Sequence, residues 1–220
     1  MRVFAAIVPP PAVLDEVFTL VDSVQVVPES QPQQRRGLLG RLASKGQPRG
    51  EQAAGEPVAP APPQLDVTSR ELAHLPVSGF GNVTLADSRR LAAALRTAVA
   101  SWPRPQLHFS GATALEWPGD EAVWAKLGGD VDGLMTVARG VPMVVQRLGF
   151  FVDRRQFRPW MAVGTINAGT TAPYLEQLVA ALTAHRGSGW VLDHVSLMRR
   201  SNEEDGELQF EELEKLRLAR

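Results

Sequence analysis

Apolar and polar positions alternate in short runs along this chain, and stretches with helical spacing lie between these runs. Residues 2–8 alternate and then become apolar, which predicts a buried strand that ends at the prolines 9–11. A helix to about residue 25 should follow, because apolar side chains recur at helical spacing after Pro11. The chain therefore begins with a strand and an amphipathic helix.

This arrangement returns at Leu72–Gly81 (LAHLPVSGFG) and at Phe157–Ile166 (FRPWMAVGTI). Each segment is a short apolar run with strand-like alternation, and each is followed, after a turn, by an amphipathic helix. A bulky ring stands early in each run, His74 in the first and Trp160 in the second. We interpret the two runs as equivalent strands of a duplicated chain.

The remaining segments complete the two halves with helices, a hairpin, a late strand and a last segment at residues 207–217. Asp87 is the expected N-cap of one helix, and His185 is expected to be exposed at the C-terminal end of another. A break is expected at residues 140–142, because this GVP sequence interrupts a helical pattern. The expected bounds are 65–68 for a short strand, 87–102 for a helix, 106–115 and 122–127 for the hairpin, 131–148 and 172–184 for helices, and 190–198 for a late strand. The pattern of residues 207–217 fits either a strand or a short helix.

Residues 29–64 differ in composition from the rest of the chain. Prolines are interleaved with Gln, Gly, Ala and Arg, and aromatic residues are absent. Such a segment buries too little apolar surface to offset its ordering entropy, so we predict a disordered insertion. Its Arg and Lys residues permit an RNA-binding or partner-binding arm, although a solvated linker is the favoured interpretation.

Composition and charge exclude several classes of protein. Of 220 residues, 44% are hydrophobic and 21% are charged, which suits a single domain of two lobes over residues 1–220. A formal net charge of -1 gives no sign of the overall basicity typical of nucleic-acid-binding proteins. Cysteine is absent, which excludes disulfides and thiolate sites, and the apolar start is too short for a signal peptide or membrane span. We expect a cytoplasmic monomer that does not contact a membrane.

Metal and cofactor motifs are also absent from the sequence. The segment GGDVDG at residues 128–133 lacks the later ligands of a calcium loop, and its Asp130 and Asp132 fit the start of a helix. Neither a glycine-rich phosphate loop nor a cluster with metal-ligand spacing occurs elsewhere. We therefore expect no metal and no cofactor.

The first run, within RELAHLPVSGFGNV, resembles the first motif of the 2H phosphoesterase superfamily, in the branch of RNA 2′,3′-cyclic phosphodiesterases and 2′-5′ RNA ligases. That motif reads His, any residue, Thr or Ser, a hydrophobic residue, and then a short run ending in Leu-Gly. The second run resembles the second motif, in which Arg-Pro precedes the same pattern. Residues 1–21 and the segment DHVSLMRRS resemble the family's opening strand and helix and its closing strand. The resemblance implies an α+β fold with two similar antiparallel sheets around a central cleft, one motif facing the cleft from each lobe.

Three of the four functional positions of these motifs differ from the family. His74 stands at the first motif's His, but Pro76 replaces the Thr or Ser, while Trp160 replaces the second His and Ala162 the second Thr. By resemblance, one His protonates the leaving oxygen, the other activates water, and the two hydroxyls hold the phosphate. This chain keeps one half of the acid-base pair and neither hydroxyl.

The resemblance makes His74 the candidate catalytic residue and Arg158 and Trp160 the candidate substrate-binding residues. Arg158 retains the family's Arg before Pro, and contact with a phosphate and a simple surface position in a turn are equally compatible with it. Trp160 could stack on a base or fill the space of the lost His, and its bulk favours filling.

Three functional hypotheses stay open. The favoured one is a catalytically impaired relative that binds RNA ends or nucleotides, because a positioned acid or base typically contributes ~10² to 10⁴ in rate. The alternatives are an active cyclic phosphodiesterase that uses His74 alone, and a non-catalytic partner-binding protein whose cleft has closed.

Overall fold

The structure is a computed structural model that describes residues 1–24, 63–153, 155–202 and 208–219. Almost all of the predicted insertion, residues 29–64, lies outside these ranges. The described chain has the α+β fold that the sequence predicts. Its strands are β1 (Arg2–Ile7), β2 (Asp66–Val67), β3 (Leu75–Asn82), β4 (Gln106–Trp117), β5 (Asp120–Gly129), β6 (Trp160–Thr165), β7 (Trp190–Val191), β8 (His194–Asn202) and β9 (Leu208–Arg217). Its helices are α1 (Pro11–Ser23), the 3₁₀ turn η1 (Arg70–Leu72), α2 (Leu85–Val99), α3 (Val131–Arg147) and α4 (Ala172–Ala184).

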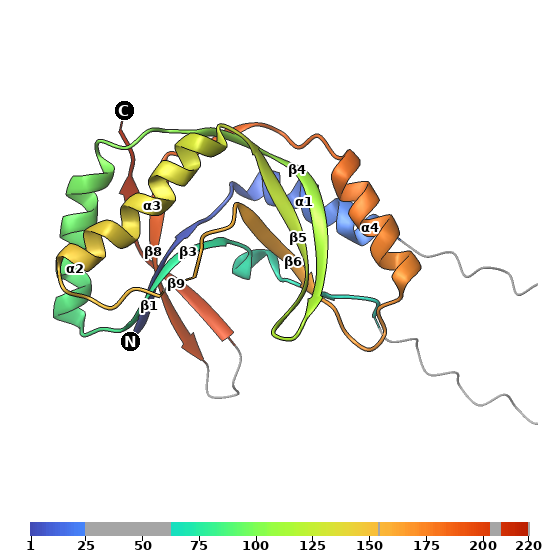
Figure 1. The fold of residues 1–220 in the computed structure, drawn as a ribbon, viewed down its shortest axis with the longest axis horizontal. Helices are drawn as coiled ribbons and strands as arrows, with labels where there is room; N and C mark the ends of the chain where they lie inside the picture. The colour runs from blue at the N-terminus through green and yellow to red at the C-terminus, as the bar shows by residue number, and fades with distance from the viewer. Residues whose placement is uncertain (25–62, 154, 203–207, 220) are drawn as a thin grey trace, which may run out of the picture.

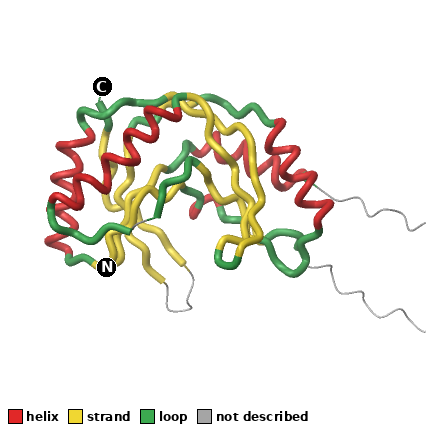
Figure 2. The backbone as a smooth tube through the Cα atoms, in the orientation of Figure 1, coloured by secondary structure: helices red, strands yellow, loops and turns green. Residues whose placement is uncertain are grey.

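Antiparallel pairing joins these strands into two sheets (Figure 2). Sheet A has the strand order β3-β1-β8-β9, and sheet B has the order β2-β6-β5-β4-β7. The predicted hairpin, β4 and β5, forms the middle of sheet B, and the two motif strands β3 and β6 fall in different sheets. The duplicated arrangement of the motif strands, one in each sheet, is therefore present in the fold.

The helices form the outer sides of an arch whose inner side consists of the two sheets (Figure 1). Helices α2 and α3 lie beside sheet A, whereas α1 and α4 lie beside sheet B. Two of these helices cross between the halves. Helix α3 follows β5 of sheet B but contacts β3 of sheet A, and α1 follows β1 of sheet A but contacts α4. These crossings pack the two halves of the chain against each other.

Each sheet has one face buried beneath helices and one more open face. Leu75 in β3 and Met161 in β6 are fully buried on the helix side. Successive side chains of a strand point to opposite faces, so the alternate positions lie on the open side. Pro76 is exposed there on sheet A, and Trp160 and Ala162 are half-buried on sheet B. The altered motif positions therefore lie on the open faces of the two sheets.

The segment 190–198 is two strands, not the single strand that the alternation predicted. Trp190 and Val191 pair with β4 in sheet B, and the chain then crosses to sheet A, where β8 begins at His194. Backbone hydrogen bonds hold both residues of the crossing: Leu192 donates to the Pro105 carbonyl at 2.9 Å, and the Asp193 carbonyl accepts from Leu218 at 2.9 Å. Local alternation continues through this crossing, so it gave no signal of the change of sheet.

Helix α3 has no break at Pro142, contrary to the prediction. A proline removes one helical hydrogen bond, yet the helix buries an apolar stripe whose burial outweighs that loss. The buried residues of the stripe are Leu134, Val137, Ala138, Val141 and Val145. Gly140 gives room for the ring of Trp102, because a Cβ at that position would lie 2.5 Å from the Trp102 Cζ2 atom.

Two helix ends also differ from the predictions. Thr84, not Asp87, is the N-cap of α2, because the Thr84 hydroxyl accepts the Asp87 backbone N–H at 3.1 Å. Thr84 also donates to the Asp87 carboxylate at 2.7 Å, so the two side chains satisfy each other, much as in a capping box. His185 is half-buried at the C-cap of α4, not exposed, and its Nε2 atom lies 3.9 Å from a carboxylate oxygen of Glu16.

Candidate functional site

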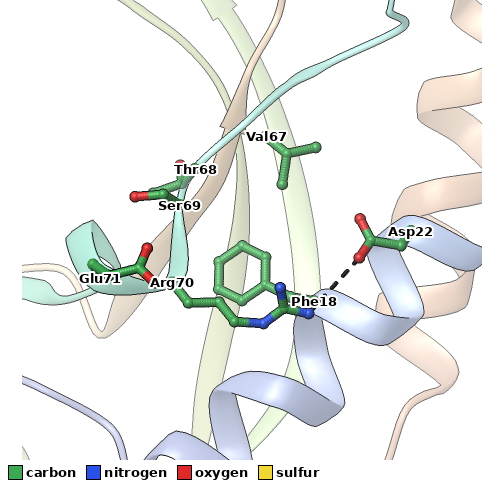
Figure 3. A pocket seen from close by; sticks show the side chains of 7 residues that line it. All are labelled: Phe18, Asp22, Val67, Thr68, Ser69, Arg70 and Glu71. Atoms are coloured by element: carbon green, nitrogen blue, oxygen red, sulfur yellow. Dashed lines mark ion pairs between the residues drawn. The ribbon is translucent and has the colours of Figure 1, made fainter.

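His74 directly precedes β3, the edge strand of sheet A. The turn η1 comes just before it, and Arg70 of η1 fastens this turn to α1. The Arg70 guanidinium lies 3.0 Å from Asp15. It also lies 3.8 Å from Asp22 and covers the Phe18 ring at 5.6 Å (Figure 3). Arg70 is thus engaged with helix α1, and its contacts fix the backbone that presents His74.

The imidazole ring of His74 is packed and oriented. Its Nδ1 atom donates a hydrogen bond to the Leu72 carbonyl at 2.7 Å, and its ring lies 5.3 Å from Phe4 and 4.8 Å from Phe210, between centroids. Burial lowers the pKa of His74 from its ordinary 6.5, and the hydrogen bond to Leu72 opposes part of that shift. With the Nδ1 proton held by a carbonyl, Nε2 of the neutral ring is the atom able to accept a proton.

A groove of about 630 Å³ opens beside His74 on the open face of sheet A. Its walls come from the connection between β1 and α1, from η1, from the crossing between β7 and β8, and from β9. Asp193 and His194 also line it, and the His194 Nδ1 atom lies 2.5 Å from a carboxylate oxygen of Asp193. The sequence analysis did not identify these two residues, because a single expected strand hid their position at a change of sheet.

Trp160 begins β6 and lies on the open face of sheet B between two cations. The Lys126 ammonium and the Arg158 guanidinium are each 5.1 Å from the centre of its ring system. Lys126 is the cross-strand partner of Trp160, which explains their contact. The sequence analysis missed Lys126, since the pairing register of β5 with β6 is not a local property of either strand. Trp160 is half-buried, so part of its ring is open to solvent.

Arg158 is not a free surface residue. Its guanidinium lies 3.1 Å from the Asp120 carboxylate, and it stays exposed to solvent. The ion pair and the Trp160 ring hold the side chain on the same face as Lys126. We name Lys126, Arg158 and Trp160 the tryptophan platform. It combines an aromatic surface with two positive charges, the chemistry that suits a base and a phosphate.

The predicted site residues have different neighbours in the structure. His74 lines the groove on sheet A, whereas neither Arg158 nor Trp160 is among the residues that line it. The two positions that hold hydroxyls in the family motifs, Pro76 and Ala162, offer no hydroxyl in this chain. Arg158 and Trp160 contact each other, with the guanidinium 5.1 Å from the centre of the ring system.

Metal and membrane sites are not found in the part of the chain that the structure describes. Within these residues, no group of three or more His, Asp or Glu side chains is placed to hold a metal ion. None of the described helices is long and apolar enough to cross a membrane.

Comparison with solved structures finds this fold in other proteins. LigT of E. coli without ligand matches with a TM-score of 0.64 and 14% identity over 100% of this chain and 98% of that chain. TT0787 of Thermus thermophilus matches with a TM-score of 0.60 and 16% identity over 99% and 98% of the two chains. A protein described only as a phosphoesterase gives 0.62 and 15% over 100% and 99%. By sequence, no family model and no curated protein matches the chain.

These matches span the whole chain and show that it has the fold of the LigT-type 2H phosphoesterases. The resemblance that the two motifs carry is thereby confirmed for the fold. Other crystal structures of E. coli LigT contain NADP+, phosphate, 3′-AMP or ATP. All four of these LigT ligands carry phosphate groups.

Proposed function

We propose that this protein is a relative of the RNA 2′,3′-cyclic phosphodiesterases that binds RNA ends or nucleotides on its tryptophan platform. The observation that carries the proposal is the position of the Trp160 ring, 5.1 Å from both the Lys126 and the Arg158 cations. An aromatic face flanked by positive charge can stack on a base while its cations meet the phosphate. The nucleotides and phosphate found with E. coli LigT support a ligand of this class.

The charge on the platform favours an anion. Asp120 neutralises part of the Arg158 charge at 3.1 Å, whereas no described carboxylate lies within ion-pair distance of Lys126. The two cations and one anion leave a net positive charge on this face, although the whole chain has a formal net charge of -1. A phosphate can thus be attracted locally without the overall basicity that the sequence lacks.

Trp160 also weakens catalysis by the two-motif mechanism. A tryptophan indole N–H is a donor only and cannot take a proton from water, so Trp160 cannot act as the second histidine. Pro76 and Ala162 add no hydroxyl to hold the phosphate. Loss of one acid or base costs ~10² to 10⁴ in rate, so hydrolysis through the two motifs should be far slower than in a complete site.

Binding of a short oligonucleotide that ends in a 2′,3′-cyclic phosphate tests this proposal. We expect Trp160→Ala to weaken binding by about 1–3 kcal/mol, the range found for loss of one stacked base. Removal of a phosphate contact by Arg158→Ala should also reduce the salt dependence of binding, with a slope change of about 0.7 for single-stranded RNA.

Matched substitutions control for side-chain type. Trp117 is 74% exposed at the end of the β4–β5 hairpin, so Trp117→Ala removes a tryptophan away from the platform. Arg155→Ala does the same for an exposed arginine near Arg158 in sequence. Equal affinity of the wild type, Trp160→Ala and Arg158→Ala would reject the platform and favour the partner-binding hypothesis.

A further inference from the structure

Asp193 and His194 enter the groove at the point where the chain passes from sheet B to sheet A. Both sides of this crossing are fixed by backbone hydrogen bonds, from Leu192 to Pro105 and from Leu218 to Asp193, each 2.9 Å long. His194 then begins β8, in the middle of sheet A. The backbone that holds this pair is thus part of the sheet framework, as a site with defined geometry requires.

The Asp193 carboxylate orients the His194 ring. An oxygen of Asp193 lies 2.5 Å from the His194 Nδ1 atom, so a proton on Nδ1 is donated to the carboxylate and Nε2 faces away from it. Burial acts to raise the pKa of Asp193, but the hydrogen bond and charge of His194, together with the backbone and Arg104, outweigh burial and lower it. An ionised carboxylate on Nδ1 fixes the tautomer of a histidine and stabilises positive charge on its ring.

The register of sheet A places His74 and His194 on either side of one residue, Val8. The pairings of β1 end at Ile7 with Leu75 and at Ala6 with Ser196. Extending these two registers beyond the end of β1 sets His74 and His194 opposite Val8 from its two sides. All three residues line the groove. Neighbouring strands are ~4.8 Å apart, so the Cα atoms of the two histidines are separated by about 10 Å. Two imidazoles at that separation can stand on opposite sides of a phosphoryl group.

Both histidines hold their Nδ1 protons in hydrogen bonds, His74 to a carbonyl and His194 to a carboxylate. The two rings therefore differ in their electrostatic surroundings, which is the usual basis for assigning one as base and the other as acid. His74 is packed between Phe4 and Phe210, surroundings that favour the neutral ring. His194 has the Asp193 carboxylate on its Nδ1 atom.

We propose that His74 and the Asp193–His194 pair form an acid-base site in this groove that hydrolyses a cyclic phosphodiester of a nucleoside. Nε2 of His74 takes a proton from water while the water oxygen forms a bond to phosphorus. The bond from phosphorus to the 2′ or 3′ oxygen breaks, and Nε2 of protonated His194 gives its proton to that oxygen. One water is consumed, one nucleoside monophosphate forms, and a proton exchange with solvent restores both rings. The substrate class rests on the proposed function, whereas the pairing of the two histidines rests on the register.

The other groups of the groove fit a small nucleotide. A volume of about 630 Å³ lies within the usual range of small-molecule sites, ~300–1,000 Å³. Prolines 9–11 and Phe210 supply apolar wall for a base or sugar. Lys215 also lines the groove and supplies a cation, whose ammonium lies 3.6 Å from the Glu212 carboxylate. The same carboxylate accepts a hydrogen bond from the Ser196 hydroxyl at 2.5 Å. The Trp190 indole N–H, in another lining residue, is buried without a hydrogen-bond partner.

Hydrolysis of a 2′,3′-cyclic mononucleotide by the full chain, followed by chromatography of the product, tests the proposal. We expect slow but measurable turnover by the wild type, and at least a roughly 100-fold loss with either His74→Ala or His194→Ala. Trp117→Phe should leave turnover unchanged, because Trp117 is exposed at the end of the β4–β5 hairpin and does not line the groove. Asp193→Asn should lower kcat and shift the alkaline limb of the pH profile, where the general acid loses its proton, an effect that a purely structural role would not cause.

A second variant keeps the test independent of folding. His194→Gly with added imidazole should regain turnover in proportion to the imidazole concentration, and the same imidazole should not affect the wild type. Full turnover by His194→Ala, or no turnover by a wild type that binds the nucleotide, would overturn the pairing. Neither result bears on the platform, which is judged by binding to the Trp160 and Arg158 variants.

Discussion

His74 and Trp160 stand at equivalent places, directly before β3 and at the start of β6, but their rings meet opposite surroundings. The His74 ring packs edge-on against Phe210 with centroids 4.8 Å apart, whereas the Trp160 ring lies beside the Lys126 and Arg158 cations. One position of the duplicated pair is thus suited to proton transfer and the other to stacking and charge. The two halves of the chain have the same plan and different chemistry.

Restoring the family pattern should raise hydrolysis of a 2′,3′-cyclic end. The triple variant Trp160→His, Ala162→Thr and Pro76→Thr supplies the missing base or acid and both hydroxyls. We expect an increase of ~10² to 10⁴ in turnover from the restored acid-base partner. Pro76 is exposed on an edge strand, so a threonine there requires no central hydrogen bond of the sheet to be remade.

Substitutions made in the triple variant and in the wild type show whether the restored His or His194 is the partner of His74. In the triple variant, His74→Ala should remove the gained activity, while His194→Ala should have little effect, because the restored His would be the partner of His74. In the wild type, both substitutions should matter. Ordinary phosphodiesterase rates in a wild type that depend on His74 and not on His194 would favour the hypothesis in which His74 acts alone.

Protonation of His74 should make the fold less stable in mild acid. Burial lowers its pKa in the folded chain below 6.5, so the unfolded chain binds more protons between the two pKa values. Stability therefore rises with pH through that window and is fully present above pH 6.5. Denaturant unfolding of the wild type should show a greater loss of stability from about pH 7.5 to about pH 5 than His74→Phe, which cannot titrate.

The comparison with His74→Phe cancels other titrating groups. Glu71, Glu212, Lys215 and the Asp193–His194 pair line the same groove and are present in both proteins. Parallel pH profiles for the two proteins would show that His74 is not desolvated in solution. A steeper profile for the variant would contradict the packing of its ring.

Gly140 should be required by the Trp102 ring and not by the helix itself. Alanine is favoured over glycine in a helix by about 1 kcal/mol, but its Cβ here would lie 2.5 Å from Trp102 Cζ2. We expect Gly140→Ala to destabilise the fold by about 1–3 kcal/mol, as for overpacked cores. Trp102→Leu in the same chain should relieve the clash, so the two changes should be non-additive in thermal or denaturant unfolding. Additive losses would place the strain elsewhere.

Local patterns predicted those parts of the fold that are set by local physics. The helix 172–184 was placed at its observed bounds, because a threonine cap, an early proline and a regular apolar stripe all lie within it. Positions that depend on distant pairing were missed. The division of 190–198 between two sheets follows from the partners of β7 and β8, and the Lys126 contact follows from the register of β5 with β6.

The candidate site was predictable only for the residues that lie in the two motifs. The resemblance of the two motifs indicated His74, Arg158 and Trp160, and in the structure the Arg158 guanidinium lies 5.1 Å from the Trp160 ring. The Asp193–His194 pair carried no signal, since both residues fall within the single strand expected at 190–198. Only the three-dimensional register places His194 beside the groove of His74.

Arg70→Ala should release His74 without unfolding the protein. The Arg70 side chain is 46% exposed and its ion pairs with Asp15 and Asp22 are at the surface, so the loss in global stability should stay within about 1 kcal/mol. The effect on η1 should be larger, because Arg70 fastens that turn to α1 and the next residues carry His74 and its Leu72 acceptor. A looser turn lets water reach the ring, so the pKa of His74 should move up towards 6.5.

An NMR titration of the imidazole signals measures this shift, and Arg89→Ala, which removes an exposed arginine on α2, serves as the control. An unchanged His74 titration in Arg70→Ala would mean that the aromatic contacts alone hold the ring in place.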